Sequence, residues 1–293
     1  MINDFKVIYI AGAGRSGSTL LDMVLGSQDG VASAGELVNL TGCYLRREYC
    51  SCHETLDDCS VWGRVVREFQ HRNNLDLAGL RLFSKEDLYF SHPGRIGAWI
   101  YAVIFPKSRR YIQYLNRLES LFQIYAEISG KSYLCDSSKS PVRLISITRV
   151  FGAHRVFPLQ LIRNPRDIML SLAKGLHKDL QKGVQSDIKP RPYLRTACWW
   201  LTVNLMCFFS VWWFSLSSVE IRYDRLCSAT DSEIKKINGS FGYKSSIKRS
   251  HIAAGNRMRM LDNVQIRPAS EGEDVKFMGS SLFYWVIRLL FKY

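Results

Sequence analysis

A run of glycines, hydroxyl side chains and one arginine near the amino terminus has the composition of a loop that holds a phosphate or sulfate group. It follows an apolar run at residues 7–11 and reads Gly12-Ala13-Gly14-Arg15-Ser16-Gly17-Ser18-Thr19. Leu20 and Leu21 come next, so the pattern predicts a strand, a tight turn and the start of a helix. Glycines let the backbone approach an anion, and the first N–H groups of the helix and its dipole stabilise the negative charge.

The loop lacks the lysine that nucleoside triphosphatases use. Their pattern, Gly-x4-Gly-Lys-[Ser/Thr], has Ser18 at the lysine position here, and the cation of the loop, Arg15, comes earlier. Without that lysine the loop is poorly equipped to stabilise charge on β- and γ-phosphates. A single phosphate beside a sulfate therefore fits the loop better.

A second candidate anion-binding segment follows the apolar run at residues 155–162. It reads Arg163-Asn164-Pro165-Arg166-Asp167, and Ser171 comes eight residues after Arg163. Arginine offers a planar fork to phosphate oxygens. A serine two turns into the following helix can face the same side as the arginine, although an arginine at a strand end is by itself a weak signal.

These segments resemble the sulfotransferases that use 3′-phosphoadenosine 5′-phosphosulfate (PAPS). The loop is similar to the family's 5′-phosphosulfate loop, and Arg163 with Ser171 is similar to its 3′-phosphate signature. Further matches follow in the family's order: Asp136-Ser137-Ser138-Lys139-Ser140-Pro141, Tyr223-Asp224-Arg225-Leu226 ahead of Phe241-Gly242, and His251, Gly255-Asn256 and Arg259. The resemblance implies an α/β fold with three layers, a central parallel sheet and a P-loop-like 5′-phosphosulfate-binding loop.

The resemblance also implies which residues act in sulfuryl transfer to an acceptor hydroxyl. This reaction needs in-line positioning, charge stabilisation on the leaving group and a base. The implied catalytic residues are Arg15 at the sulfate, Lys139 at the leaving phosphate and Glu36 as the base. The implied PAPS-binding residues are Gly14, Arg15, Ser16, Gly17, Ser18, Thr19, Arg163, Ser171 and Arg259. Pro141 occupies the position at which the phenol and steroid branch has its base histidine, and no metal is expected.

Other interpretations of the same residues stay open. In a P-loop kinase or nucleoside triphosphatase, Asp136 would hold magnesium, and magnesium dependence would reveal it. A catalytically dead, membrane-peripheral relative would bind anions without turnover, and the substitution Glu36→Gln would leave its anion binding unchanged. If neither residue has a catalytic role, Glu36 is an ordinary glutamate at the start of a helix, and Lys139 is a solvated lysine on the surface. Nucleic-acid binding is disfavoured because the basic residues are dispersed and no reading motif is present.

Strands that alternate with helices are expected to position these residues in one domain spanning residues 1–293. Predicted strands begin at Lys6 and cover 132–135, 155–162 and 219–223, and predicted helices cover about 18–27, 110–128 and 231–238. Such a pattern favours a parallel sheet with ligands beyond the carboxyl ends of its strands. Residues 41–130 match no family segment and are expected to form a variable acceptor side, less regular and basic up to Arg110. Residues 175–195 are polar and predict a lid loop.

The charge and the apolar segments point to anionic or lipidic partners. The formal net charge of +14 favours a phosphorylated cofactor, an acidic glycan or an anionic membrane. The expected acceptor is a small molecule, a glycan or a lipid. Residues 196–219 are uncharged and interpreted as a buried core helix with some apolar surface left over, against a membrane span. The apolar residues 282–291 dock on the core or lie on a membrane surface.

The amino terminus and the cysteines bear on the compartment. No signal-peptide pattern is present, so the expected location is the cytoplasm, including the inner membrane surface, with reduced thiols. Cys43, Cys50, Cys52 and Cys59 crowd one segment beside His53. Three interpretations remain for them: unpaired buried thiols, a local disulfide, or a zinc site, for which the Cys-x-Cys spacing is tighter than usual.

Overall fold

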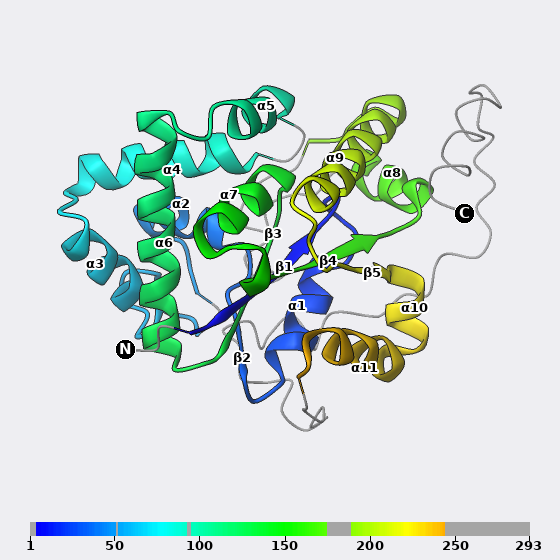
Figure 1. Ribbon diagram of the computed structural model, residues 1–293, viewed down its shortest axis with the longest axis horizontal. Helices are drawn as coiled ribbons and strands as arrows, with labels where there is room; N and C mark the ends of the chain where they lie inside the picture. The colour runs from blue at the N-terminus through cyan, green and yellow to red at the C-terminus, as the bar shows by residue number, and fades with distance from the viewer. Residues whose placement is uncertain (1–3, 51, 93–94, 175–188, 244–293) are drawn as a thin grey trace.

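The computed structural model describes residues 4–50, 52–92, 95–174 and 189–243 of the chain. Within them lies a five-stranded sheet in the order β2-β3-β1-β4-β5, and every neighbouring pair of strands is parallel (Figure 1). Its strands are β1 (Lys6–Ala11), β2 (Val31–Ser33), β3 (Tyr133–Lys139), β4 (Val156–Ile162) and β5 (Val219–Arg222). The predicted α/β class with a central parallel sheet is confirmed.

The sheet is covered on both faces, and β1 shows why. Its side chains alternate between two apolar clusters, as the two-residue period of a strand requires. Val7, Tyr9 and Ala11 belong to one cluster, while Ile8 and Ile10 belong to the other. A strand that is buried on both faces reads as a continuous apolar run, which is what residues 7–11 are.

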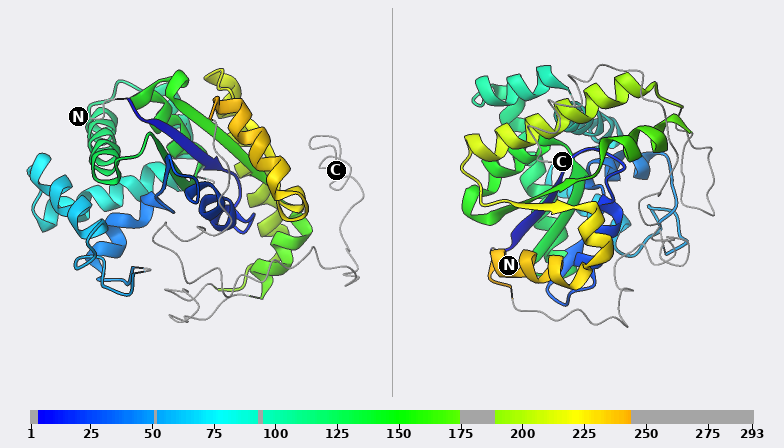
Figure 2. Two further views of the ribbon diagram at one scale, coloured as in Figure 1. Left: turned by 90° about the horizontal axis from the view of Figure 1, so that it is seen from below. Right: turned by 90° about the vertical axis from the view of Figure 1, so that its right-hand side faces the viewer.

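Two layers of helices supply the partners of these clusters (Figure 2). The side of Ile8 is covered by α1 (Ser18–Gly26), α10 (Tyr223–Ser228) and α11 (Thr230–Phe241). The side of Tyr9 is covered by a larger group, α3 (Trp62–Arg72), α4 (Leu77–Ser91), α5 (Ile96–Ile104), α6 (Arg109–Ser129), α7 (Pro141–Phe151) and α9 (Tyr193–Trp213). The remaining helical pieces are η1 (Leu37–Asn39), α2 (Leu40–Leu45), η2 (Ala153–Arg155) and α8 (Pro165–Ala173).

The prediction of a less regular stretch up to Arg110 is wrong. Helices α2, α3, α4 and α5 occupy most of it. Helix α4 is capped by Asp76, the residue before its start, whose side chain accepts the N–H of Gly79 at 2.7 Å. Buried Leu80 and Phe83 then follow at helical spacing. The basic and cysteine-rich composition of the stretch concealed this amphipathic pattern.

Helix α9 has the length and apolarity of a membrane-spanning helix, and within the described residues it alone does. One of its faces packs on the core through residues that include Ala197, Trp200 and Val203. The opposite face exposes large apolar side chains near its carboxyl end. This arrangement agrees with the interpretation of a core helix with apolar surface left over, although the helix ends at Trp213 and begins at Tyr193, inside the predicted lid loop.

The order of the strands marks the position of a ligand site. From β1 the chain moves outward to β2, returns to β3, and then passes to the other side of β1 to form β4 and β5. The carboxyl end of β1 is therefore a topological switch point, where open α/β sheets bind their ligands. The loop that follows β1 and the ends of β3 and β4 meet there.

Candidate active site

The loop between β1 and α1 has a backbone that few residues other than glycine can adopt. Gly12 has φ +138°, and a Cβ placed there would lie 2.4 Å from the carbonyl oxygen of Leu161 in β4. Gly17 has φ +92°, and a Cβ there would lie 2.4 Å from the ring of Tyr223. Arg15 also has a positive φ of 70°, which costs a non-glycine residue free energy and is typical of functional sites.

The amino terminus of α1 is suited to an anion. The N-cap position is Gly17, and no side chain among the described residues caps the helix. Its first N–H groups are thus available to a ligand, and the helix dipole favours negative charge there. The hydroxyl of Ser16 is buried and has no hydrogen-bond partner in the described part of the chain. A phosphate or sulfate oxygen could accept hydrogen bonds from the first N–H groups of α1 and from the Ser16 hydroxyl.

The structure brings Arg15, Arg163 and Ser171 together. Arg15 Nε donates to Ser171 Oγ at 3.2 Å, and Arg163 Nη1 donates to the carbonyl oxygen of Arg15 at 3.2 Å. The Arg163 guanidinium lies 4.3 Å from the centre of the Tyr223 ring and its Nε lies 3.5 Å from Asp167 Oδ2. The end of β4 and the loop after β1 therefore form one site.

This site concentrates positive charge. Burial, and then the neighbouring charge of Arg163, lower the pKa of Arg15 from its ordinary value. Both effects disfavour the charged form of the Arg15 guanidinium. A bound anion would favour the charged form again, because opposite charges attract. Asp167 compensates part of the charge of Arg163 only, through a contact at 3.5 Å.

Lys139 and Glu36 form an ion pair beside this site. Lys139 ends β3 with a φ of +68°, and its Nζ donates to Glu36 Oε1. The other carboxylate oxygen, Oε2, accepts from Asn39 Nδ2 at 2.9 Å. The Lys139 side chain is 12% exposed and that of Glu36 34% exposed. The lysine is not a solvated surface residue, and the carboxylate can be reached from solvent.

Backbone hydrogen bonds hold Glu36 against β3. The N–H of Ala34 donates to the carbonyl oxygen of Cys135, and the N–H of Ser137 donates to that of Gly35, both at 2.8 Å. Gly35 has a φ of +63°, which turns the chain between Ala34 and Glu36. The carboxylate is thereby placed at the end of the strand that carries Lys139.

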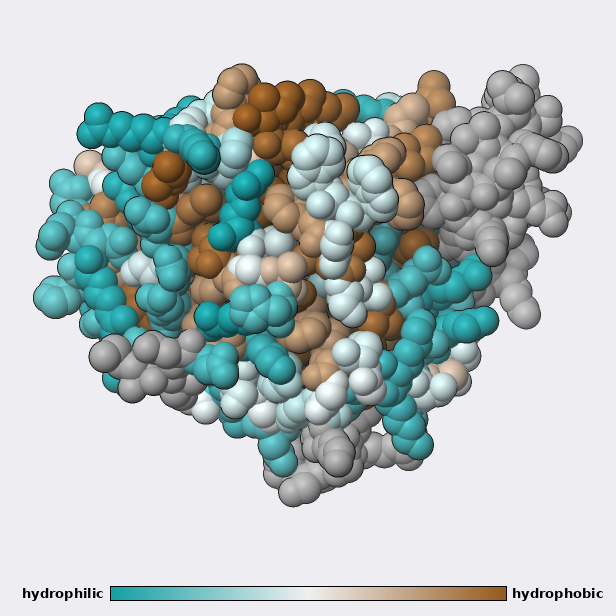
Figure 3. Space-filling model, viewed as in Figure 1, coloured by the Kyte–Doolittle hydropathy of each residue, from teal (hydrophilic) through white to brown (hydrophobic). Residues whose placement is uncertain are grey.

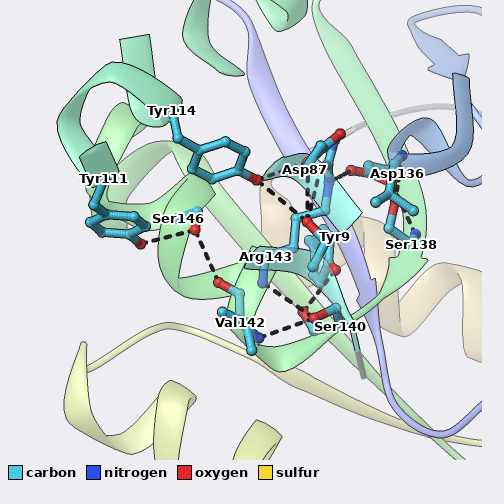
Figure 4. Close-up of polar contacts among 12 residues, drawn as sticks. Tyr9, Asp87, Tyr111, Tyr114, Asp136, Ser138, Ser140, Val142, Arg143 and Ser146 are labelled. Carbon is cyan, nitrogen blue, oxygen red and sulfur yellow. Dashed lines mark hydrogen bonds and ion pairs between the residues drawn. The ribbon is translucent and has the colours of Figure 1, made fainter. Parts of the chain in front are cut away.

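The strand that ends at Lys139 also contributes Asp136 to a buried group of charges that the sequence did not reveal (Figure 4). Arg143 Nε donates to Asp136 Oδ2 at 2.8 Å, and Arg143 Nη1 donates to Asp87 Oδ1. Tyr114 also donates to Asp87, at 2.8 Å. Ser138 donates through its backbone N–H, at 2.9 Å, and its hydroxyl to Asp136. These contacts join β3, α4, α6 and α7.

The two buried carboxylates keep Arg143 charged in spite of its burial. Burial alone lowers the pKa of Arg143, but Asp87 and Asp136 outweigh that effect and raise it above its ordinary value. Asp136 is fully buried and engaged with Arg143 and Ser138. Both of its carboxylate oxygens accept hydrogen bonds from these residues, Oδ1 from Ser138 and Oδ2 from Arg143, so the group is already engaged where a magnesium ligand would need free oxygens. This disfavours the kinase alternative.

Some predicted site residues lie outside the described residues. They are Arg259 and its motif partners His251, Gly255 and Asn256, together with residues 175–188 of the predicted lid and the apolar residues 282–291. Asn39 and Tyr223 contact the site although neither was predicted to have a role. Tyr223 begins a motif that the sequence did mark, whereas Asn39 had no signal beyond its spacing of three residues from Glu36.

Comparisons with known proteins show the family and the fold. A family model described as "Sulfotransferase family" matches residues 8–245. No curated protein sequence matches the chain. The fold is similar to the sulfotransferase domain from the curacin biosynthetic pathway, with a TM-score of 0.56 and 14% identity over 98% of this chain and 97% of that one.

Two other solved structures have similar folds. One is the sulfotransferase domain from the Synechococcus PCC 7002 olefin synthase, with a TM-score of 0.55 and 16% identity over 100% of this chain and 97% of that one. The other is the sulfotransferase STF1 from Mycobacterium tuberculosis H37Rv, with a TM-score of 0.51 and 13% identity over 86% and 72%. At these identities the likeness is one of fold.

Proposed function

The chain belongs to the sulfotransferase family, and from that premise we propose that it transfers a sulfuryl group from PAPS to an acceptor hydroxyl. The observation that carries the proposal is the meeting of Arg15, Arg163 and Ser171 at an uncapped helix start, beside the Lys139–Glu36 pair. Arg15, Arg163, Ser171 and the helix start together can bind two anionic groups. The Lys139–Glu36 pair adds a cation and a carboxylate beside them. PAPS supplies the sulfuryl group and leaves as 3′-phosphoadenosine 5′-phosphate (PAP).

In this proposal the loop after β1 binds the 5′-phosphosulfate of PAPS, and the residues after β4 bind its 3′-phosphate. The N–H groups from Gly14 to Thr19 and the buried hydroxyl of Ser16 hold the 5′-phosphosulfate, with Arg15 at the sulfate. Arg163 and Ser171 hold the 3′-phosphate. Arg259, whose motif lies outside the described residues, is assigned to the same nucleotide. The donor site needs no metal, because guanidinium and N–H groups supply the charge stabilisation.

Glu36 and Lys139 divide the chemical work. Lys139 stabilises the negative charge that develops on the leaving phosphate oxygen. Once its ammonium turns to that oxygen, the Glu36 carboxylate is free to accept the proton of the acceptor hydroxyl. The bond between sulfur and the leaving oxygen breaks as the bond to the acceptor oxygen forms. Asn39 holds Glu36 in place through Oε2 during this exchange.

Arg163→Ala is expected to weaken PAP binding about ten- to a hundredfold, which is what the loss of a charge-assisted hydrogen-bonding group costs. Isothermal titration calorimetry of the purified chain measures it directly. The matched control is Arg81→Ala, which removes the same charge from an exposed position on α4 and should leave affinity unchanged. Equal affinity in wild type and Arg163→Ala would contradict the assignment of the 3′-phosphate.

The acceptor is proposed to be a hydroxyl of a small molecule, a glycan or a lipid, and an apolar surface favours a location at a membrane. This surface consists of exposed residues of α5, of Phe105 directly after it and of α9, namely Ile96, Ile100, Ile104, Phe105, Phe208, Phe209, Trp212 and Trp213. Trp99 Nε1 donates to Ser210 Oγ at 3.0 Å and so ties the two helices together. Figure 3 shows hydrophobic side chains gathered along the edge of the molecule over α5.

Exposed basic residues flank this apolar surface, among them Arg95, Lys107 and Arg110. Aromatic side chains beside cations are typical of proteins that lie on an anionic bilayer. The proposed location is therefore the cytoplasm, at the inner membrane surface.

Binding to vesicles that contain anionic lipid is expected to weaken about tenfold or more when Trp212 and Trp213 are both replaced by Ser, because each large apolar side chain contributes about 1.5–3 kcal/mol on burial. Co-sedimentation of the full chain with the vesicles measures this. Leu82→Ser, on the exposed face of α4, is the control. Unchanged sedimentation of the double variant would contradict the membrane assignment and leave the donor site untouched.

A further inference from the structure

Three cysteines outside the candidate active site bring their sulfur atoms together in the segment that joins α2 to α3. The Sγ atoms of Cys50, Cys52 and Cys59 lie within 4.8 Å of one another, and those of Cys50 and Cys59 are 3.6 Å apart. A disulfide requires about 2.05 Å. Around a tetrahedral zinc ion with Zn–S bonds of about 2.3 Å, two sulfurs are about 3.8 Å apart. The spacing of the sulfurs fits metal-bound thiolates.

We propose that Cys50, Cys52 and Cys59 bind a zinc ion that fastens this segment to the start of α3. Thiolates select soft or borderline ions such as Zn²⁺ over magnesium or calcium. Each thiol gives up its proton to solvent as its sulfur–zinc bond forms. Cys52 and the adjacent His53 are exposed, so the fourth position of the tetrahedron is open to water or to the imidazole.

The backbone of the segment presents two of these sulfurs on a short hairpin. Tyr49 and Thr55 form an antiparallel bridge. The N–H of Cys50 donates to the carbonyl oxygen of Glu54 at 2.8 Å, and that of His53 donates back to Cys50 at 3.0 Å. This tight turn is what makes the Cys-x-Cys spacing compatible with one ion.

The third sulfur, that of Cys59, lies just before α3, which starts at Trp62. Cys59 Sγ accepts the N–H of Trp62 at 3.5 Å, and the positive end of a helix favours a thiolate at that place. Cys43, the fourth cysteine of the segment, is outside the group; its sulfur accepts from Arg46 Nη2 at 3.6 Å.

The segment has little regular secondary structure, and turns, side-chain hydrogen bonds and ion pairs hold its described residues. Between residues 46 and 61, the described residues form no helix and no strand beyond the single bridge. A two-stranded hairpin is marginally stable in water by itself. An ion that joins its turn to α3 adds the free energy of metal binding to the folding of this part of the chain. The proposed site is thus structural, and it is independent of the sulfuryl-transfer chemistry.

The test is the zinc content of the full chain, purified in reducing buffer after growth with added zinc and measured by mass spectrometry of the metal. Wild type and Cys43→Ser are expected to carry stoichiometric zinc, while Cys52→Ser and Cys59→Ser fall to background. Because Cys52 is exposed, its replacement removes a ligand without opening the core. Circular dichroism checks that the variant is folded. Removal of zinc by a chelator is expected to lower the melting temperature of wild type by roughly 5 °C or more.

Cobalt provides a second measurement. Co²⁺ added to the metal-free chain is expected to give a thiolate-to-metal charge-transfer band in wild type and Cys43→Ser, and to lose it in Cys52→Ser. Three results would overturn the proposal: wild type without zinc or cobalt binding, zinc retained in Cys52→Ser, or a Cys50–Cys59 disulfide found by peptide mapping of the reduced-buffer preparation.

Discussion

Replacing Glu36 by Gln is expected to lower turnover by about a hundred- to ten-thousandfold, which is the contribution of a positioned general base. Its Oε1 accepts from Lys139 and its Oε2 lies 2.9 Å from Asn39, so a glutamine keeps the shape of the site but cannot take the hydroxyl proton. PAP binding should therefore persist within a few-fold of wild type. The measurement is PAP release from PAPS with the acceptor that wild type turns over fastest, alongside calorimetric PAP binding.

Glu68→Gln is the matched control for this experiment. Glu68 is also paired with a cation, Arg72, at 2.7 Å, but it lies on α3. Its replacement should leave turnover unchanged. Wild-type turnover in Glu36→Gln would remove Glu36 from the mechanism. A loss of PAP binding equal to the loss of turnover would instead show that the carboxylate shapes the donor site.

Replacing Arg143 by Met is expected to destabilise the fold by about 3–5 kcal/mol, because it leaves Asp87 and Asp136 buried without their cation. Both carboxylates are at most 1% exposed in their side chains. Denaturant titration measures the change as a shift of the midpoint at unchanged slope. Asp136 and Lys139 lie on the same strand, β3. We therefore expect the fraction of the variant that still folds to lose the ion pair between Lys139 and Glu36 as well.

The control is Arg72→Met, which removes an arginine that is paired with two carboxylates at 36% side-chain exposure. Exposed pairs contribute about 0–1 kcal/mol, so its midpoint should move little. Equal shifts in Arg143→Met and Arg72→Met would show that the buried group contributes no more than a surface ion pair does.

The part of the site that could be predicted from the sequence is the part that the chain builds locally. The loop after β1 follows directly from its glycines and from the apolar strand before it. Arg163 was predictable because it ends an apolar run, and parallel strands present their carboxyl ends at one edge of the sheet. The roles of these residues in PAPS binding remain proposals.

The buried ion pairs between distant segments could not be predicted. Arg143 is fifty-six residues from Asp87, and nothing in the local pattern of either residue distinguishes a buried ion from a surface charge. The same holds for the position of Tyr223 over Arg163. Lys139 and Glu36 were both expected at the site, but their ion pair also depends on backbone hydrogen bonds to β3, which have no signature in the sequence. Tertiary packing decides such pairings, and local propensity carries no information about it.

Calorimetric titration of the wild-type chain with PAP, with and without magnesium and against ATP, tests the central claim most directly. The account predicts tight binding of PAP that does not depend on magnesium, and weaker binding of ATP, which lacks the 3′-phosphate that Arg163 and Ser171 are proposed to hold. A preference for ATP with magnesium, or no binding of PAP, would contradict the account and favour the kinase alternative.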